Sequence, residues 1–167
     1  LRYPEVYAGL DWAMQNPDIS VSPSYTILTM LVVHQDRYEV VFVKRYSGLE
    51  SDPEYQIQDI AEQCQRAGVT RLFCDWGVGH RENIRLRNIL GDQVVTEVRY
   101  TNQGMKLRWD DDRLCYNVSR TRIMQDLFED IKQGRFLFPQ WEETATYAKD
   151  ILSVFVDYGN RVLRETR

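Results

Sequence analysis

Hydrophobic and β-branched residues form three runs in the first third of the chain, and polar segments separate them. The runs span 6–12, 25–33 and 38–46, and each has the length and composition of a β-strand. Only the polar residues 34–37 separate the second run from the third. A connection this short predicts that these two strands form an antiparallel hairpin.

The spacing of hydrophobic residues changes after position 52. Hydrophobic positions then recur every three or four residues, at Ile57, Ile60, Ala61 and Cys64. This spacing predicts a helix over about 53–67, with Asp52 as its N-cap, Pro53 in its first turn and Gly68 at its end. The run that ends in Asp75 follows at once, which makes a strand–helix–strand unit. That run can therefore pair in parallel with the first strand, at the centre of the sheet.

The second half of the chain alternates helical and extended segments. We expect a helix over about 80–90 with Ile84, Ile89 and Leu90 facing inward, then a short strand over 93–99. The remaining predicted elements are an extended hairpin over 104–118, a helix over 120–133 capped by Ser119, a strand over 136–138, and a last hairpin formed by 151–158 and 161–165. This order of elements predicts an α/β fold with a mixed β-sheet flanked by helices.

The bulk composition fits one globular domain. The chain has 167 residues, of which 43% are hydrophobic and 12% aromatic, enough for a single core. It has no apolar stretch of the ~18 residues that cross a bilayer and no signal-peptide pattern at its start, so we expect no membrane partner. Three cysteines without a C-x-x-C pattern indicate reduced thiols in a cytosolic protein. Both ends fall within or just after extended segments, so we expect residues 1–167 to be one domain of a longer protein.

Two aspartates stand at the ends of hydrophobic runs, and they are the main candidates for chemistry. Asp11 ends the first run and Asp75 ends the fourth, and each is followed by tryptophan. A single aspartate at a strand end is usually a cap or a turn residue. Two on neighbouring strands would form an acidic pocket that repels itself until a cation binds. Hard oxygen ligands select Mg²⁺ or Mn²⁺, and two such ions catalyse phosphodiester hydrolysis.

Basic residues are distributed unevenly, although the net charge is −4. The candidates for contact with a nucleic-acid backbone are Lys106, Arg108, Arg113, Arg120 and Arg122. For any one arginine, a solvated surface position is the simpler interpretation, and Asp110–Asp112 in the same hairpin would repel phosphate. Asp18, in the loop after the first strand, and His80, at the start of a helix, are secondary candidates for the acidic site.

Several of these segments, taken in order, resemble a known family. They are Tyr7-Ala8-Gly9-Leu10-Asp11-Trp12, Phe73-Cys74-Asp75-Trp76-Gly77-Val78-Gly79-His80, Ser119-Arg120-Thr121-Arg122 and Arg135-Phe136-Leu137-Phe138-Pro139. Together they are similar to the nuclease domain of the terminase large subunits of tailed bacteriophages, over most of the chain. The resemblance implies an RNase H-like fold with an added β-hairpin, and metal-dependent cutting of double-stranded DNA during viral genome packaging.

The resemblance also implies partners and site residues. It places an ATPase domain upstream, adds the terminase small subunit and the portal protein as partners, and locates the protein in the cytoplasm of the infected bacterial host. The ATP-binding motif G-x-x-x-x-G-K-[ST] is absent from this sequence. Asp11 matches the first metal-ligating aspartate of the family and Asp75 the second acid. The third acid of the family follows the final hairpin, so we expect it beyond Arg167; Asp150 and Asp157 are the nearest candidates within the sequence.

Two other interpretations remain open at this point. The first is another nuclease of the same fold, either a Holliday-junction resolvase or a transposase-like enzyme, which a preference for four-way junctions would reveal. The second is a non-catalytic docking domain of the packaging motor, which would bind no metal ion through the two aspartates. The acidic charge and the missing third acid favour this second alternative.

Overall fold

The computed structural model describes residues 4–13, 25–102, 107–140, 142, 145, 154–157 and 162–165. In chain order the elements are β1 (Glu5–Asp11), β2 (Thr26–Val33), β3 (Tyr38–Tyr46), the 3₁₀ helix η1 (Gly48–Ser51), α1 (Pro53–Ala67), β4 (Val69–Asp75), α2 (His80–Leu90), β5 (Val95–Thr101), β6 (Leu107–Asp110), β7 (Cys115–Ser119), α3 (Arg120–Lys132), β8 (Phe136–Leu137), β9 (Val154–Asp157) and β10 (Val162–Glu165).

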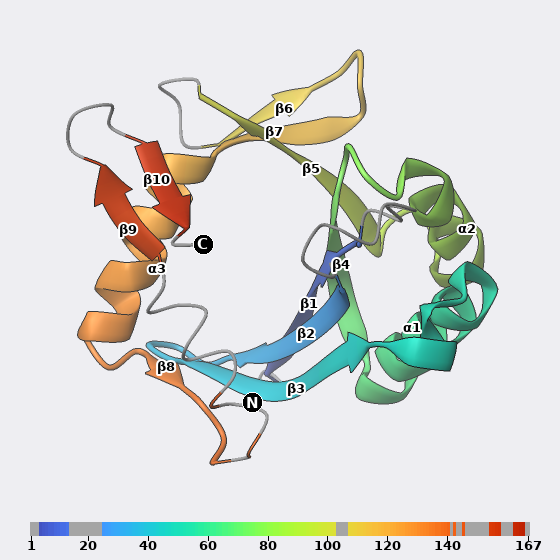
Figure 1. Cartoon of the computed structure of the whole chain (residues 1–167), viewed down its shortest axis with the longest axis horizontal. Coiled ribbons are helices and arrows are strands. Elements are labelled where there is room, and N and C mark those ends of the chain that lie inside the picture. The colour runs from blue at the N-terminus through green and yellow to red at the C-terminus, as the bar shows by residue number, and fades with distance from the viewer. Residues whose placement is uncertain are drawn as a thin grey trace.

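Eight strands of the described chain form one mixed sheet, in the order β6-β7-β5-β4-β1-β2-β3-β8 (Figure 1). Strand β1 pairs antiparallel with β2 and parallel with β4, and β2 pairs antiparallel with β3. Strand β5 continues the parallel part beside β4. The predicted hairpin and the central position of the first and fourth strands are therefore confirmed. The inner order β3-β2-β1-β4-β5, with β2 reversed, is the RNase H-like arrangement.

Helix α1 begins and ends at the predicted residues because both caps form as expected. The Asp52 side chain accepts a hydrogen bond from the backbone N–H of Tyr55 at 2.9 Å. Gly68 ends the helix in the left-handed region, at φ +65°, and its N–H donates to the carbonyl groups of Cys64 and Gln65. Glycine takes up this conformation without the strain that a side chain would cause.

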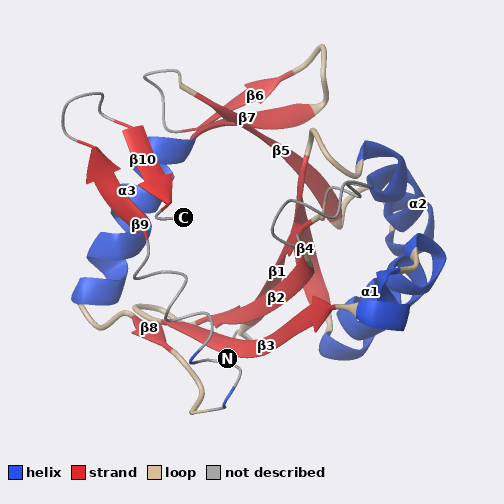
Figure 2. Ribbon diagram, in the orientation of Figure 1, coloured by secondary structure: helices blue, strands red, loops and turns tan. Residues whose placement is uncertain are grey.

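The core lies between the central strands and the two helices α1 and α2. Leu10, Leu72 and Cys74 from β1 and β4 are buried together with Ile57 and Ile60 of α1. Both helices cover the same side of the sheet, whereas α3 and the β9–β10 hairpin lie on the other side (Figure 2). Successive strand residues point to opposite faces, so one face of β1 and β4 packs under helices and the other carries the strand-end aspartates.

Of the three residues predicted to face inward on α2, Leu90 does so, whereas Ile84 and Ile89 do not. Ile84 and Ile89 are 42% and 40% exposed, whereas Asn83 and Leu86 are fully buried. Leu90 is partly buried against the core. The inward-facing positions 83, 86 and 90 have helical spacing, but the first of them is polar. A prediction from hydrophobic residues therefore placed Ile84 and Ile89 inward instead. The reason that an amide occupies this core position lies in its hydrogen bonds, described below.

The C-terminal elements follow the prediction with small shifts in their bounds. Strands β6 and β7 form the expected hairpin, and β9 pairs antiparallel with β10. Helix α3 contacts β7 and β10, but the side chain of Ser119 makes no capping hydrogen bond at its start. Cys64, Cys74 and Cys115 are buried free thiols, as expected. Within the described residues, none of the helices has the length and apolar character needed to cross a membrane.

Candidate active site

Asp11 and Asp75 lie side by side at the carboxyl ends of two central strands. The last ladder pair of the parallel strands β1 and β4 is Leu10 with Cys74, and each aspartate is the next residue along its strand. Neighbouring strands are about 4.8 Å apart. The two aspartates, predicted from sequence to be neighbours, thus occupy equivalent positions at the carboxyl ends of adjacent strands.

Both carboxylates point away from helices α1 and α2. Leu10 and Cys74 face the core under those helices, and side chains alternate along a strand. Tyr100, near the end of β5, lies on the face of the sheet opposite to these helices. Its pKa is raised by partial burial and then by the negative charges of Asp11 and Asp75, while Arg120 acts against them. The field of both aspartates therefore reaches one tyrosine on this face.

Asp75 is held in place by the turn that follows it. One of its carboxylate oxygens, Oδ2, accepts a hydrogen bond from the N–H of Val78 at 3.3 Å. A Cβ atom added at Gly77 would lie 3.5 Å from the same oxygen, so the backbone of the turn passes close to the carboxylate. The turn therefore fixes the direction in which this side chain leaves the end of β4.

The donor set of this site fits a hard divalent cation. Two carboxylates at adjacent strand ends supply oxygen donors of the kind that Mg²⁺ and Mn²⁺ prefer. Within the described residues, however, no three side chains of His, Cys, Asp or Glu gather in a way that could hold a metal ion. Magnesium usually keeps several waters and uses one or two carboxylates together with substrate phosphates, so two aspartates are compatible with such a site.

Glu97 of β5 is a functional candidate that the sequence analysis missed. It is 2% exposed, and Nδ1 of His80 lies 2.8 Å from its Oε1. Arg87 donates from Nη2 to its Oε2 at 3.0 Å. The glutamate pairs in register with Cys74, and its charge, after burial, contributes to raising the pKa of that thiol. Glu97 therefore lies on the helix-covered face, behind the two aspartates.

Asn83 connects this buried glutamate to both strand ends. Its Nδ2 donates to Oε1 of Glu97 and to the backbone carbonyl of Asp75, each at 2.9 Å. Its Oδ1 accepts a hydrogen bond from Nε1 of Trp12 at 2.8 Å. The sequence offered a signal only for the direction of Glu97, which lies two residues after Val95 in a strand and therefore shares its inward face. It gave no signal for the hydrogen-bond partners of Glu97 or Asn83.

The described basic candidates lie on two different elements, the β6–β7 hairpin and the start of α3. Arg108 is exposed on β6, and Arg113 is engaged by Asp110, which accepts from its Nη1 at 3.1 Å. Arg120 and Arg122 start α3, and the guanidinium of Arg120 lies 6.0 Å from the centre of the Tyr100 ring.

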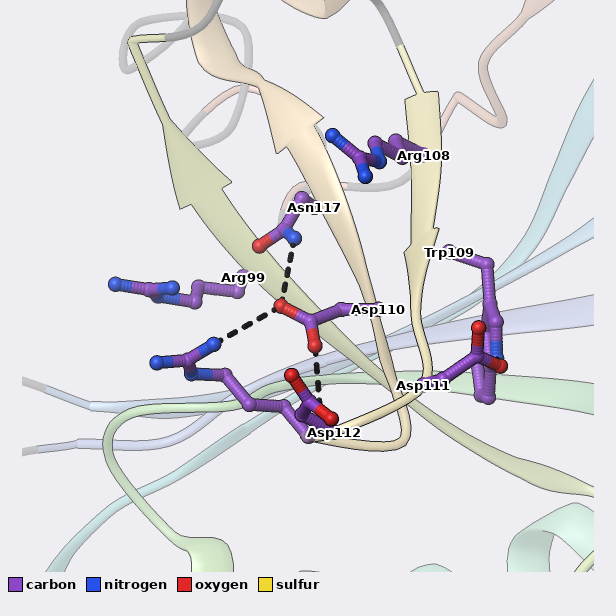
Figure 3. Close-up of a pocket in the computed structure, with 8 residues that line it drawn as sticks. Arg99, Arg108, Trp109, Asp110, Asp111, Asp112 and Asn117 are labelled. Atoms are coloured by element: carbon purple, nitrogen blue, oxygen red, sulfur yellow. Dashed lines mark hydrogen bonds and ion pairs between the residues drawn. The ribbon is translucent and has the colours of Figure 1, made fainter.

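Arg108 and Arg113 line a hollow of about 370 Å³ on the β6–β7 hairpin, together with Arg99 of β5 (Figure 3). The amide of Asn117 donates to Asp110 at the base of this hollow. Its Oδ1 has no partner in the described structure. The hollow therefore mixes three guanidinium groups with acidic residues, and the aspartates of the hairpin reduce its positive charge.

Some predicted residues lie outside the described part of the chain. These are Asp18, Lys106 and Asp150. Asp157 is the last residue of β9, where it pairs with Val162, and its side chain is not among those described. His80 is the first residue of α2, and its side chain is about half exposed. Its Nδ1 lies 2.8 Å from Oε1 of Glu97.

Comparison with known proteins identifies the fold. No protein-family model matches the chain, and no curated protein matches its sequence. Among solved structures it is similar to the large terminase of a thermophilic bacteriophage, with a TM-score of 0.61 and 11% identity over 99% of this chain. It is similar to the nuclease domain of the large terminase subunit of bacterial virus Sf6, with a TM-score of 0.59 and 13% identity over 98% of this chain and 77% of that one.

A human virus provides a third match. The terminase nuclease domain of human cytomegalovirus has a TM-score of 0.57 and 12% identity, over 95% of this chain and 76% of that one. The same domain soaked with manganese matches with a TM-score of 0.55. The chain spans 36% of the thermophilic phage terminase and 64% of another chain of the cytomegalovirus domain. At these identities the likeness establishes a common fold, that of terminase nuclease domains.

Proposed function

We propose that this chain is a metal-dependent DNA endonuclease domain that cuts double-stranded DNA during viral genome packaging. The observation that carries the proposal is the placement of Asp11 and Asp75. Each follows one member of the last β1–β4 ladder pair, Leu10 with Cys74, at the ends of two central parallel strands. The similarity in fold to terminase nuclease domains, one of them soaked with manganese, supports the reaction class and the type of ion.

In this proposal Asp11 and Asp75 are the residues that would hold the metal ions. When bound there, Mg²⁺ or Mn²⁺ would lower the pKa of an attacking water and stabilise the leaving 3′ oxygen. The protein's own contribution is to hold the two carboxylates at fixed strand ends. The turn after Asp75 fixes one of these carboxylates through the N–H of Val78. The nucleophile would be a water molecule, so no protein nucleophile is needed.

The test is Mn²⁺-dependent nicking of supercoiled plasmid by Asp11→Asn and Asp75→Asn. Each change removes a negative ligand with little change in volume, so we expect each to lower the rate by about a hundredfold or more, because several kcal/mol of charge stabilisation are lost. The matched control is Asp92→Asn. Asp92 is exposed and precedes β5, at the opposite end of the parallel strands. Nicking by both site variants at the control rate would refute the assignment.

One observation favours a second candidate function, a docking domain of the packaging motor without catalysis. This is the lack of a third acidic ligand near the aspartates within the described residues. Calorimetric titration with Mn²⁺ separates the two functions. A nuclease site should bind the ion and lose it in Asp11→Asn, whereas a docking domain should give the same titration for both proteins.

The assembly of the parent protein is part of the same proposal. We place residues 1–167 as one nuclease domain after an ATPase domain, acting with the terminase small subunit and the portal protein in the host cytoplasm. A Holliday-junction resolvase of the same fold would instead prefer four-way junctions. Competition between linear duplex and a four-way junction of equal length measures this preference, and we expect none.

A further inference from the structure

We propose that Asn83 is a positioning residue that holds the two strand-end aspartates in register for a divalent cation. The inference rests on the proposed function, because it assigns Asn83 a task for the same site. Asn83 does not face the carboxylates itself. It lies on α2, behind the sheet, and is fully buried. Its effect must therefore pass through the backbone of the two strand ends.

The contacts of Asn83 reach both ends at once. On one side its Oδ1 accepts a hydrogen bond from the indole of Trp12, the residue directly after Asp11, at 2.8 Å. On the other side its Nδ2 donates to the backbone carbonyl of Asp75 at 2.9 Å. A single rigid amide group thus joins the residue after one proposed ligand to the backbone of the other.

This connection is placed where the ladder between the two strands ends. The last β1–β4 ladder pair is Leu10 with Cys74, so Asp11 and Asp75 both lie one residue beyond it. A shift of either end by a fraction of an ångström would change the distance between the two carboxylates. Divalent cations with octahedral preference tolerate little variation in ligand position, so a side-chain bridge at this level has a direct consequence for metal affinity.

The amide is in turn fixed by a buried ion pair. The second Nδ2 hydrogen of Asn83 goes to Oε1 of Glu97 at 2.9 Å, and the other oxygen of that carboxylate accepts from Arg87 at 3.0 Å. The orientation of the amide is determined by these partners, because a flipped amide would place its oxygen against the carboxylate of Glu97. A fully satisfied buried polar network specifies one geometry, whereas a hydrophobic residue of similar size would leave the strand ends free to shift.

Close packing against Gly79 also fixes the position of the Trp12 side chain. Gly79, at the N-terminus of α2, has φ +82°, and a Cβ atom there would overlap the indole ring of Trp12. The ring therefore lies directly on the first turn of α2, one helical turn before Asn83. Hydrogen bond and packing together tie the segment after Asp11 to α2.

The experiment measures Mn²⁺ binding by calorimetry in Asn83→Ala and Trp12→Phe. The first change removes every hydrogen bond of the Asn83 side chain. The second keeps an aromatic ring beside Gly79 but removes the indole N–H together with part of the ring volume. Loss of outer-shell partners typically weakens metal binding by about 10–100-fold, so we expect about a tenfold weaker Mn²⁺ affinity for Asn83→Ala and a smaller loss for Trp12→Phe. The Mn²⁺ concentration for half-maximal plasmid nicking should rise by the same factor, and excess Mn²⁺ should restore the rate.

A matched control separates positioning from general destabilisation. Leu86→Ala removes a fully buried side chain from the same face of α2, so it lowers stability while the hydrogen bonds of Asn83 to the strand ends stay in place. We expect its Mn²⁺ affinity to equal that of the unchanged protein at a temperature where both are folded. Should Asn83→Ala fail to fold, Trp12→Phe against Leu86→Ala makes the same comparison.

The outcomes are distinct from those that test the proposed function. If the unchanged chain binds Mn²⁺ through Asp11 and Asp75, but Asn83→Ala and Trp12→Phe bind it with the same affinity, the positioning role is wrong and the nuclease proposal stands. An equal loss of affinity in Leu86→Ala also overturns the positioning role. If the unchanged chain binds no Mn²⁺, the proposed function fails, and the inference fails with it.

Discussion

Asp59 of α1 is a partly buried carboxylate whose partners come from two elements. Its Oδ2 accepts hydrogen bonds from Nζ of Lys44 at 3.0 Å and from the hydroxyl of Tyr46 at 2.8 Å, both on β3. Gln63, one turn further along α1, donates to its Oδ1. Burial by itself would raise the pKa of Asp59, but these three donors outweigh it and lower the pKa below the ordinary value. The carboxylate therefore connects α1 to β3.

The lowered pKa of Asp59 predicts how the stability of the protein depends on pH. A carboxylate with a lowered pKa stabilises the folded state above the pKa it has in the unfolded chain, about 3.9, and this contribution is lost as the pH falls through the lower, folded-state pKa. We expect Asp59→Asn to reduce the free energy of unfolding by about 1–2 kcal/mol at pH 7. Urea unfolding should show this difference shrinking below about pH 4.

The control for this prediction is Asp36→Asn in the hairpin turn. The side chain of Asp36 is 80% exposed, and its Oδ2 lies 3.8 Å from Nε of Arg37. An exposed ion pair of this kind contributes little, so we expect no measurable change in stability at either pH. A difference between Asp59→Asn and the unchanged protein that stays constant down to about pH 3 would contradict the linkage.

At the scale of elements, the junction between β4 and α2 is constrained by both backbone conformation and packing. Asp75 ends β4, and five residues later the helix begins, with Gly79 in the left-handed region. The Asn83 N–H closes the first turn on the carbonyl of Gly79 at 2.8 Å. The indole of Trp12 fills the space where a side chain at Gly79 would lie. The start of α2 and the segment after β1 therefore both depend on the absence of a side chain at Gly79.

We expect Gly79→Ala to destabilise the protein much more than Gly68→Ala. Both glycines have positive φ, but a Cβ at Gly68 would meet no atom within 4 Å, so the control measures conformational strain alone, about 1–2 kcal/mol. Gly79→Ala adds the displacement of Trp12, a further ~1–3 kcal/mol typical of overpacking. Chemical denaturation gives both values. Equal losses for the two variants would mean that Trp12 moves aside without cost.

The elements also differ in how well sequence alone could describe them. Helix α1 was predicted residue for residue because its cap, first-turn proline and terminal glycine are local signals. Helix α2 had the correct bounds, but two of its three predicted inward residues, Ile84 and Ile89, are exposed, since the neighbouring buried position is the polar Asn83. At Ser119 the expected cap residue is in place without its hydrogen bond. Local chemistry therefore predicts bounds well, while the face of a helix depends on its partners.

At the scale of the whole molecule, net charge and metal binding are linked. The chain carries a formal charge of −4, and two of its acids converge at the ends of the central strands. Two divalent ions would bring the formal charge from −4 to 0, since they add four positive charges. A protein of this charge attracts DNA only through local basic surface or bound cations.

Metal binding at this site should also raise thermal stability. A ligand that binds only the folded state at about 100 times its dissociation constant adds about 2.7 kcal/mol. For a domain of this size that corresponds to a rise in Tm of roughly 5–10 °C. We expect saturating Mn²⁺ to raise the Tm of the unchanged chain and of Asp92→Asn, and EDTA to reverse the rise. Asp11→Asn should show little of it; an equal rise in all three proteins would place the cation elsewhere.

Sequence alone predicted the approximate strands, the bounds of α1 and α2, and the neighbouring positions of the strands that end in Asp11 and Asp75. The strands and helices follow from periodicity and caps, which depend on nearby residues, and the strand neighbours follow from the pairing rules of a strand–helix–strand unit. The tertiary structure alone decided what lies behind the aspartates. Asn83, Glu97 and Trp12 are far apart in the chain, and only folding brings their donors and acceptors to 2.8–2.9 Å. Hydrogen-bond partners depend on three-dimensional position, which hydrophobic spacing does not encode.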